Sequence, residues 1–247
     1  MTIKIGIQLY TVRDHTKGDM LSTLDALAAF GYEYIETAGY GNATAKEVRS
    51  TLDRTGMQAI SSHVSFQRLT HELDAVTDEM LTLGCQWVVI PRLAPEYRSP
   101  TGITAASALM NEWSHRFAEA GLSFGYHNHE FEFEVIDSST MFDRIRDETA
   151  EANLSLEIDL GWALYAGADP VSLIRENAGR VPLLHGKDLS ADRGSATTGT
   201  GILPWPEIVQ AARESSVEFL IVENDQPVDS LTDAEAAIGN LEKLLAL

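Results

Sequence analysis

The chain has 247 residues, of which 44% are hydrophobic and 22% are charged, a composition typical of a globular protein with a substantial buried core. Its 18 basic and 37 acidic residues give a net charge of −19, which disfavours binding to nucleic acid and to anionic membrane surfaces. We expect one domain over residues 1–247, with neither a nucleic acid nor a membrane as partner.

The N-terminal segment MTIKIGIQLY lacks the basic region and long apolar stretch of a secretion signal. No segment of the chain reaches the ~18 to 20 apolar residues that a membrane span needs. Cys85 is the single cysteine, so no intramolecular disulfide can form, and we expect a buried thiol at this position. Together these features predict a cytoplasmic protein.

Short runs of β-branched and aromatic residues recur along the chain and predict buried strands. In chain order they cover residues 3–10, 32–37, 58–64, 87–93, 123–129, 154–160, 181–188 and 218–225. The segments between them have apolar residues at helical spacing, as in residues 20–30, 75–83 and 107–120. The predicted order is a strand followed by a helix, eight times.

Several glycines lie just past a helical pattern and shortly before the next strand, where a left-handed helix cap favours glycine. They are Gly31, Gly56, Gly84, Gly121 and Gly179. Eight such β/α units in a chain of this length predict an α/β protein with a (β/α)₈ TIM barrel. A doubly wound open sheet is the alternative, but no Gly-rich phosphate-binding turn follows the first strand. Residues 189–206 are expected to form a long loop after the seventh strand.

Polar side chains gather at the C-terminal ends of the predicted strands, where TIM barrels form their active sites. They are Glu36, His63, His127, His129, Glu157, Asp159, His185, Lys187, Glu223 and Asp225. Because side chains alternate between the two faces of a strand, four of them are expected to converge inside the barrel. These four are His127, Asp159, His185 and Glu223.

Two imidazoles and two carboxylates suit Mn²⁺, Co²⁺, Zn²⁺ or Fe²⁺, with coordination positions left for a substrate. A single histidine or carboxylate at a strand end more commonly anchors a loop, but four on consecutive strands favour a metal site. Glu36, Glu157 and Asp225 are expected to be structural or to support that site. The remaining histidines, His15, His71 and His115, are expected on surface helices or loops.

At these residues the sequence resembles the sugar phosphate isomerase/epimerase family with a xylose isomerase-like TIM barrel. The superfamily also contains endonuclease IV, ketose 3-epimerases and inosose dehydratase. The motifs that carry the resemblance are GIQLYTVR, GYEYIE, SSHVSF, GYHNHEFEFE, LEIDLGWALYAGADP, HGKDL, GTGILPWPEI and VEND. The resemblance implies a divalent-metal site on strands five to eight, in which Asp159, His185 and Glu223 match three ligands. His127 stands at the fourth position, with His129 or Glu130 as alternatives.

Two positions depart from the pattern of the ketose 3-epimerases. His127 replaces a ligand glutamate, and Trp162 replaces a histidine. Those epimerases use two ligand glutamates as opposed acid and base, so the departure favours the branch near inosose dehydratase and enzymes of 3-keto sugars.

The resemblance implies a divalent-metal-dependent isomerase or epimerase that acts on a sugar or keto sugar through an enediolate. Mn²⁺ is the first choice of metal, with Co²⁺, Zn²⁺, Fe²⁺ or Mg²⁺ as alternatives. Alternative functions are a metal-dependent lyase of a 3-keto sugar, 3-keto glycoside or inosose, and a non-catalytic sugar-binding barrel. A repair endonuclease of this fold is disfavoured by the net charge. Similar barrels are commonly homo-oligomers.

Roles follow for individual residues near the predicted metal site. Glu223 is the predicted base, and Lys187 and His129 are predicted proton donors or oxyanion partners. The predicted substrate-binding residues are Gln8, His63, Glu132, Trp162 and Trp205. Among these, Glu132 aligns with a substrate-contacting glutamate of the epimerases, and the tryptophans offer flat faces on which a sugar ring can stack.

Overall fold

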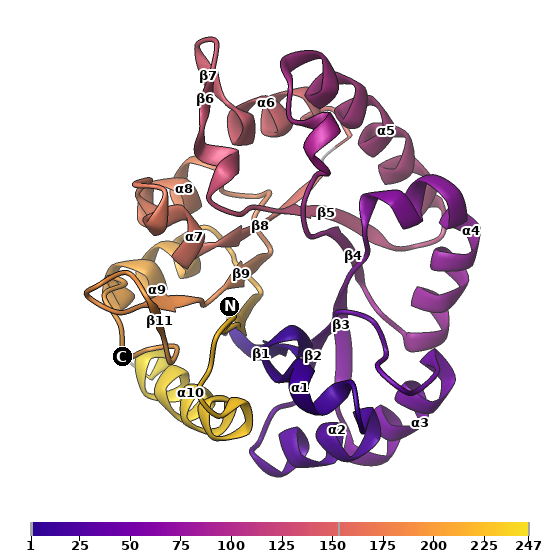
Figure 1. The fold of residues 1–247 in the computed structure, drawn as a ribbon, viewed down its shortest axis with the longest axis vertical. Helices are drawn as coiled ribbons and strands as arrows, with labels where there is room; N and C mark the ends of the chain where they lie inside the picture. Colours follow the sequence, from indigo (N-terminus) through magenta and orange to yellow (C-terminus); the bar gives the residue numbers. More distant parts are fainter. Residues whose placement is uncertain (1, 153, 247) are drawn as a thin grey trace.

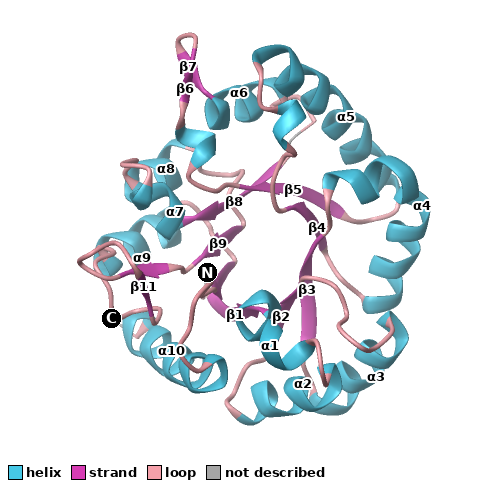
Figure 2. Ribbon diagram, viewed as in Figure 1, coloured by secondary structure: helices cyan, strands magenta, loops and turns pink. Residues whose placement is uncertain are grey.

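The computed structural model describes residues 2–152 and 154–246, in which eight parallel strands close into a barrel surrounded by helices (Figures 1 and 2). The barrel strands are β1 (Lys4–Gln8), β2 (Tyr34–Thr37), β3 (Gln58–His63), β4 (Trp87–Ile90), β5 (Ser123–His127), β8 (Ser155–Asp159), β9 (Leu183–His185) and β12 (Phe219–Val222). Each strand pairs with its neighbours in chain order, and pairing of β1 with β12 closes the ring. The predicted (β/α)₈ barrel is confirmed, and the open-sheet alternative is wrong.

The helices form the outer ring of the barrel (Figure 2). They are α1 (Arg13–Thr16), α2 (Met20–Ala29), α3 (Ala45–Thr55), α4 (Phe66–Leu83), α5 (Pro100–Glu119), α6 (Met141–Glu148), α7 (Leu160–Tyr165), α8 (Pro170–Glu176), α9 (Trp205–Glu214) and α10 (Ser230–Leu245), with 3₁₀ turns η1 (Leu9–Val12), η2 (Pro95–Tyr97) and η3 (Phe131–Phe133). Among the described residues, no helix combines the length and apolar character that a bilayer crossing requires.

Local signals in the sequence explain where the helices begin and end. The Thr44 hydroxyl and the Glu47 carboxylate form a capping box at the start of α3, and the Ser65 hydroxyl caps α4. The five glycines predicted to end helices all have φ between +70° and +102°, the left-handed conformation that favours glycine. This prediction is therefore confirmed, as is the burial of Cys85.

The segment after β9 is better ordered than the long loop expected over residues 189–206. It contains an antiparallel pair, β10 (Asp188–Leu189) and β11 (Ser195–Ala196). The buried Asp188 carboxylate accepts hydrogen bonds from the backbone N–H groups of Leu189, Gly199, Gly201 and Leu203 and from Trp205 Nε1, at 2.8–3.2 Å. A Cβ atom at Gly201 would lie 2.2 Å from the Leu189 carbonyl oxygen, so only glycine fits there. One carboxylate thus fixes the course of the whole segment.

A second hairpin, β6 (Val135–Ile136) with β7 (Ser139–Thr140), projects from the outer ring between η3 and α6 (Figure 1). It lies after β5, on the stretch that follows the GYHNHEFEFE motif. The hairpin therefore lengthens one of the loops at the C-terminal side of the barrel.

The interior of the barrel is layered from apolar to polar. Its lower half is filled by an apolar plug of six buried side chains: Ile60, Trp87, Val89, Leu183, Phe219 and Ile221. Trp87, Leu183 and Phe219 are the first residues of their strands, so the plug occupies the N-terminal end. Lys4 Nζ lies 5.0 Å from the centre of the Phe219 ring and 5.2 Å from that of Tyr34, over the base of the plug. The polar side chains are therefore confined to the upper half.

Candidate active site

The four side chains expected to converge do come together at the C-terminal mouth of the barrel. His127, Asp159 and His185 end β5, β8 and β9, and Glu223 directly follows β12. Each offers one ligand atom, and these atoms all lie within 4.8 Å of one another. All four side chains are buried. We call this set the upper ligand group.

Lys187 lies beside the upper ligand group. Its Nζ atom is 2.9 Å from Asp159 Oδ2, 3.1 Å from Glu223 Oε2 and 2.9 Å from Asp225 Oδ2. Burial would lower the pKa of Lys187, but the three carboxylates raise it above its ordinary value. The side chain is therefore a persistent cation, better suited to stabilise a negatively charged substrate oxygen than to give up a proton.

Beneath the upper ligand group lies a carboxylate layer made of Glu36 and Glu157, and both carboxylates contact the His63 imidazole. Glu157 Oε2 is 2.7 Å from His63 Nε2, and Glu36 Oε1 is 2.9 Å from the same nitrogen. Gln8 Nε2 and Ser61 Oγ donate hydrogen bonds to Glu36. Burial would lower the pKa of His63, but the two carboxylates raise it to about 10, so His63 carries a proton between them at neutral pH.

The carboxylate layer contacts two members of the upper ligand group through their imidazole rings. His127 Nδ1 lies 3.0 Å from Glu157 Oε2, while its Nε2 lies 3.8 Å from Asp159 Oδ2. His185 Nε2 lies 2.9 Å from Glu36 Oε1 and 3.2 Å from Glu157 Oε2, while its Nδ1 lies 2.7 Å from Glu223 Oε2. Each ring therefore directs one nitrogen downward and the other upward. Ligand histidines in metalloproteins are commonly held this way, with the second nitrogen bound to a carboxylate.

Protonation of the two rings differs because their neighbours differ. Burial and the nearby cationic groups hold the pKa of His127 well below its ordinary value, which leaves a neutral ring. Burial would also lower the pKa of His185, but Glu157, Glu36 and Glu223 raise it well above its ordinary value. A metal ion at His185 would consequently take the place of a proton.

The structure offers two overlapping sets of possible metal ligands. One is the upper ligand group, and the other combines His63 and Glu157 with His127 and His185. In the second set, Glu157 Oε2 contacts nitrogens of His63, His127 and His185, whereas Glu157 Oε1 is buried without a hydrogen-bond partner among the described residues. In the upper group, Asp159 Oδ2 is buried without a hydrogen-bond donor among the described residues, although Lys187 Nζ lies nearby. The two imidazoles and two carboxylates of the upper group, with ligand atoms within 4.8 Å of one another, fit a divalent cation.

A cavity of about 710 Å³ opens above the upper ligand group and is lined in part by His63, His127, His129, Trp162 and Glu223. His129 lies in the loop after β5, and its ring centre is 5.0 Å from that of His127. Burial and Lys187 lower the pKa of His129 to about 3, so its imidazole is neutral. Its Nδ1 atom has no hydrogen-bond partner among the described residues. The His129 side chain therefore lines the cavity while this nitrogen is enclosed by the protein.

The predicted substrate-binding residues separate into two kinds of position. His63 and Trp162 line the cavity. Tyr10 lines it too, although it was not among the predicted residues; it lies two residues after the end of β1. Gln8 is buried beneath the cavity against Glu36. Its predicted substrate contact is not supported by this position.

Glu132 and Trp205 also lie away from the cavity. Glu132 is fully buried in η3, where it accepts hydrogen bonds from Tyr126 Oη at 2.6 Å and the His129 backbone at 2.7 Å. Burial raises the pKa of Glu132 to about 7. Trp205 packs in the core and donates its indole N–H to Asp188. Their predicted substrate contacts are therefore not supported, because local hydrogen bonds turn both side chains inward.

The other predictions for titratable residues have clear outcomes in the structure. Neither His129 nor Glu130, the alternative fourth ligands, belongs to a ligand group among the described residues. Glu36 and Glu157, expected to be structural or supporting, are in direct contact with the predicted ligands. The histidines expected at the surface, His15, His71 and His115, are exposed.

Comparison with known proteins gives matches over most of the chain. A model of the family described as xylose isomerase-like TIM barrel matches residues 24–244. An inosose dehydratase from Geobacillus kaustophilus is 27% identical over 207 residues, which cover 72% of this chain and 64% of that protein. The chain thus spans less than two thirds of the length of this relative.

Solved structures share the fold at lower sequence identity. A sugar phosphate isomerase/epimerase from Parabacteroides distasonis has a TM-score of 0.83 and 23% identity, covering 98% of this chain and 94% of its own. The IOLI protein with a bound zinc atom has a TM-score of 0.81 and 15% identity, covering 99% of this chain and 98% of its own.

Proposed function

The chain belongs to the family of xylose isomerase-like TIM barrels, and from this premise we propose that it is a divalent-metal-dependent isomerase or epimerase of a sugar or keto sugar. One observation carries the proposal: two imidazoles and two carboxylates meet beside Lys187 at the floor of the cavity. The similarity to an inosose dehydratase and the shared fold of a sugar phosphate isomerase/epimerase support a polyhydroxylated substrate with a carbonyl group.

The upper ligand group is the proposed metal site, with His127, Asp159, His185 and Glu223 as ligands. A bound divalent ion would supply Lewis-acid stabilisation of the negative charge that develops on a substrate oxygen. Mn²⁺ remains the first candidate, and the zinc atom reported in the IOLI protein supports testing Zn²⁺ beside it.

Proton transfer is assigned to groups of the chain that face the cavity. Glu223 would take a proton from the carbon next to the substrate carbonyl, which leaves an enediolate. Burial would raise the pKa of Glu223, but Lys187 and His185 hold it well below its ordinary value, so the base is ionised. The Lys187 ammonium would stabilise the enediolate oxygen. Return of the proton from Glu223 to the neighbouring carbon, together with transfer of the hydroxyl proton from one enediolate oxygen to the other, would complete an isomerisation.

A lyase reaction is the second candidate, and the histidine at position 127 favours it. With an imidazole in place of the strand-five glutamate of the epimerases, Glu223 has no opposed carboxylate to return a proton on the other face. Proton removal by Glu223 could instead be followed by cleavage of the C–O bond at the β carbon. The departing oxygen would leave as water or an alcohol after taking up a proton, and a carbon–carbon double bond would remain in the product.

Metal removal and one substitution test the shared premise. After EDTA treatment, turnover of a panel of inososes and 3-keto sugars should be lost, and Mn²⁺ or Zn²⁺ should restore it. Glu223→Gln should lower the rate roughly 10² to 10⁴-fold, whereas Glu134→Gln, on an exposed loop, should leave it unchanged. Full activity of metal-free protein, or of Glu223→Gln, would contradict the proposal. Formation of an enone absorbing in the ultraviolet identifies the lyase, and a product of equal mass identifies the isomerase.

A further inference from the structure

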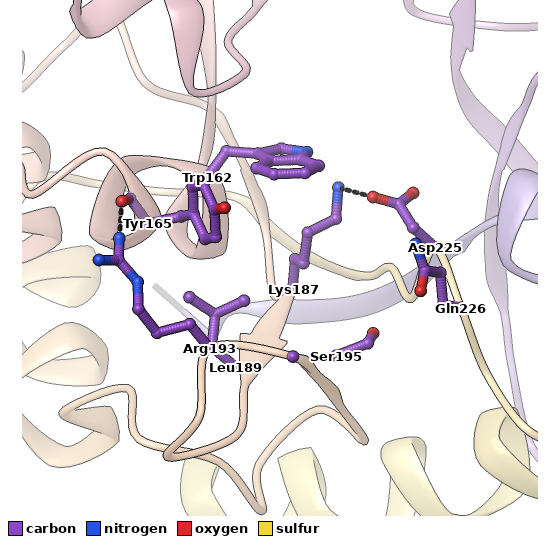
Figure 3. A pocket seen from close by; sticks show the side chains of 9 residues that line it. Trp162, Tyr165, Lys187, Leu189, Arg193, Ser195, Asp225 and Gln226 are labelled. Atoms are coloured by element: carbon purple, nitrogen blue, oxygen red, sulfur yellow. Dashed lines mark hydrogen bonds and ion pairs between the residues drawn. The ribbon is translucent and has the colours of Figure 1, made fainter.

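A second cavity, of about 230 Å³, adjoins the central one on the far side of Trp162 and Lys187. We call it the annex. Its lining includes Tyr165, Arg193 and Ser195, which Figure 3 shows grouped around the Lys187 side chain. Trp162, Asp225 and Gln226 line both cavities. A ligand seated over Glu223 can therefore extend past these shared side chains into the annex.

The sizes of the two spaces indicate an extension rather than an independent site. Binding pockets for small molecules commonly enclose roughly 300 to 1,000 Å³. The central cavity, at about 710 Å³, lies within that range, whereas the annex, at about 230 Å³, lies below it. The annex is thus suited to one further part of a ligand whose main body occupies the central cavity.

The walls of the annex suit a ring. The Trp162 and Tyr165 rings lie 5.6 Å apart between centres at an interplanar angle of 84°, so they form two perpendicular aromatic surfaces. Leu189 adds an aliphatic surface, and Ser195 and Gln226 supply hydrogen-bonding groups. Aromatic faces and edges of this kind pack against both sugar rings and aryl groups.

The charges around the annex disfavour an anionic group. Arg193 is held by Tyr165, because its guanidinium carbon lies 4.6 Å from the ring centre and its Nη2 donates to the Tyr165 carbonyl (Figure 3). Lys187 is already paired with three carboxylates. Asp225 places a negative charge on the wall opposite Arg193. The lining carries two cations, Lys187 and Arg193, and one carboxylate, Asp225. Asp159 and Glu223, which also contact Lys187, bring the carboxylates to three, so the group as a whole has no surplus positive charge for a phosphate or a carboxylate.

We propose that the annex binds an uncharged ring joined through an oxygen atom to the sugar in the central cavity, so that the substrate is a glycoside. The inference rests on the proposed function, because it takes the reacting sugar to lie over Glu223. Lys187 contacts Glu223 and also lines the annex. The oxygen linking the two rings would pass beside this ammonium, where negative charge on it would be stabilised.

Binding of simple glycosides to the metal-loaded protein tests the annex. The probes are the methyl, phenyl and 4-carboxyphenyl glycosides of glucose, galactose and mannose, as both anomers, measured by isothermal titration calorimetry. For a sugar that binds as its methyl glycoside, the phenyl glycoside should bind about tenfold more tightly, since its ring packs against two aromatic side chains. The 4-carboxyphenyl glycoside should gain less, because its charge faces Asp225.

Matched variants test whether the tighter binding of the phenyl glycoside arises in the annex. Tyr165→Ala should abolish it without changing the affinity for the methyl glycoside. Tyr10→Ala is the control, since Tyr10 lines only the central cavity and is similarly exposed, at 46% against 40% for Tyr165; it should weaken both glycosides equally. Ser195→Trp, which fills the annex from an exposed position, should also remove the gain. Circular dichroism melts verify that each variant is folded.

Equal affinity for methyl and phenyl glycosides would overturn the annex proposal, as would a gain that survives both Tyr165→Ala and Ser195→Trp. Binding of free keto sugars alone, with metal-dependent turnover intact, would likewise overturn the annex proposal and leave the proposed function standing. Loss of metal-dependent turnover on every substrate would instead remove the proposed function.

Discussion

Replacing Glu157 with glutamine tests whether the carboxylate layer orients the metal ligands above it. One oxygen of Glu157 accepts from three imidazole nitrogens, those of His63, His127 and His185, at 2.7, 3.0 and 3.2 Å. Glutamine has the same length, but it carries no charge and replaces one oxygen with an N–H donor. Such a side chain cannot serve all three rings, so the upward nitrogens of His127 and His185 should lose their fixed direction.

The expected loss of metal affinity follows from the number of ligands affected. Removing the hydrogen-bond partner of one ligand histidine commonly weakens metal binding about 10 to 100-fold. Since Glu157 contacts two ligand histidines, we expect the dissociation constant for Mn²⁺ or Zn²⁺ to rise about 100-fold. This rise corresponds to a loss of about 2.7 kcal/mol in binding free energy. Glu36→Gln should weaken binding about tenfold, because Glu36 contacts only one ligand histidine, His185.

The assay is calorimetric titration of EDTA-treated protein with each metal, with Glu134→Gln as the exposed control. Thermal melts by circular dichroism establish that the variants are folded before titration. Dissociation constants of Glu157→Gln and Glu36→Gln within about twofold of the unaltered protein would refute the reasoning. The carboxylate layer would then occupy space in the barrel without orienting the metal ligands above it.

Two further predictions concern stability. Asp188→Asn should lower the free energy of unfolding by about 3 kcal/mol in urea titrations, because the amide cannot accept all five hydrogen bonds that hold the segment after β9; unchanged stability would contradict that role. Burial raises the pKa of Glu132 from 4.5 to about 7, so its protonated form stabilises the fold fully below about pH 4.5, and this contribution is lost as the pH rises through 7. Glu132→Gln, neutral at every pH, should therefore lose less stability than the unaltered protein between pH 5 and 8, and parallel melting curves across that range would disprove the shift.

The fold was predictable because local and periodic signals agree. Glycines at the helix ends, such as Gly56 and Gly84, have the left-handed backbone that their positions indicated. Alternation also placed His127, Asp159 and His185 on the inner face of their strands, where the structure has them. These features depend on neighbours within a few residues, and sequence patterns report such neighbours directly.

Depth within the barrel was harder to predict. Glu157 precedes Asp159 by two residues, so it faces inward but lies roughly 7 Å lower along the strand. Glu36 reaches the same level from β2, across a register shift between Ile35 and Glu36 in its pairing with β3. Such a shift leaves no mark in the pattern of one strand. The joint action of the two carboxylates was therefore visible only in the structure.

Residues outside the strands were not predictable from alternation, because the backbone is not extended there. Glu132 lies in a 3₁₀ turn that points it at Tyr126, and Trp205 finds its partner in Asp188, 17 residues earlier. Neither contact follows the spacing of a strand or a helix, so the sequence pattern gives no sign of it. Residue type alone suggested a substrate contact for each, whereas packing decided otherwise.

The apolar plug closes the barrel at its N-terminal end, so the interior of the described structure is open only at the C-terminal mouth. Its six side chains and the Lys4 ammonium close the N-terminal end, so that the only approach to Glu223 within the described structure is through the mouth. For the proposed reaction, entry and departure would share one opening, so a new substrate could enter only after the previous product has left. Product held by the site would accordingly behave as a competitor of substrate, and the residence time of the product would set an upper limit on turnover.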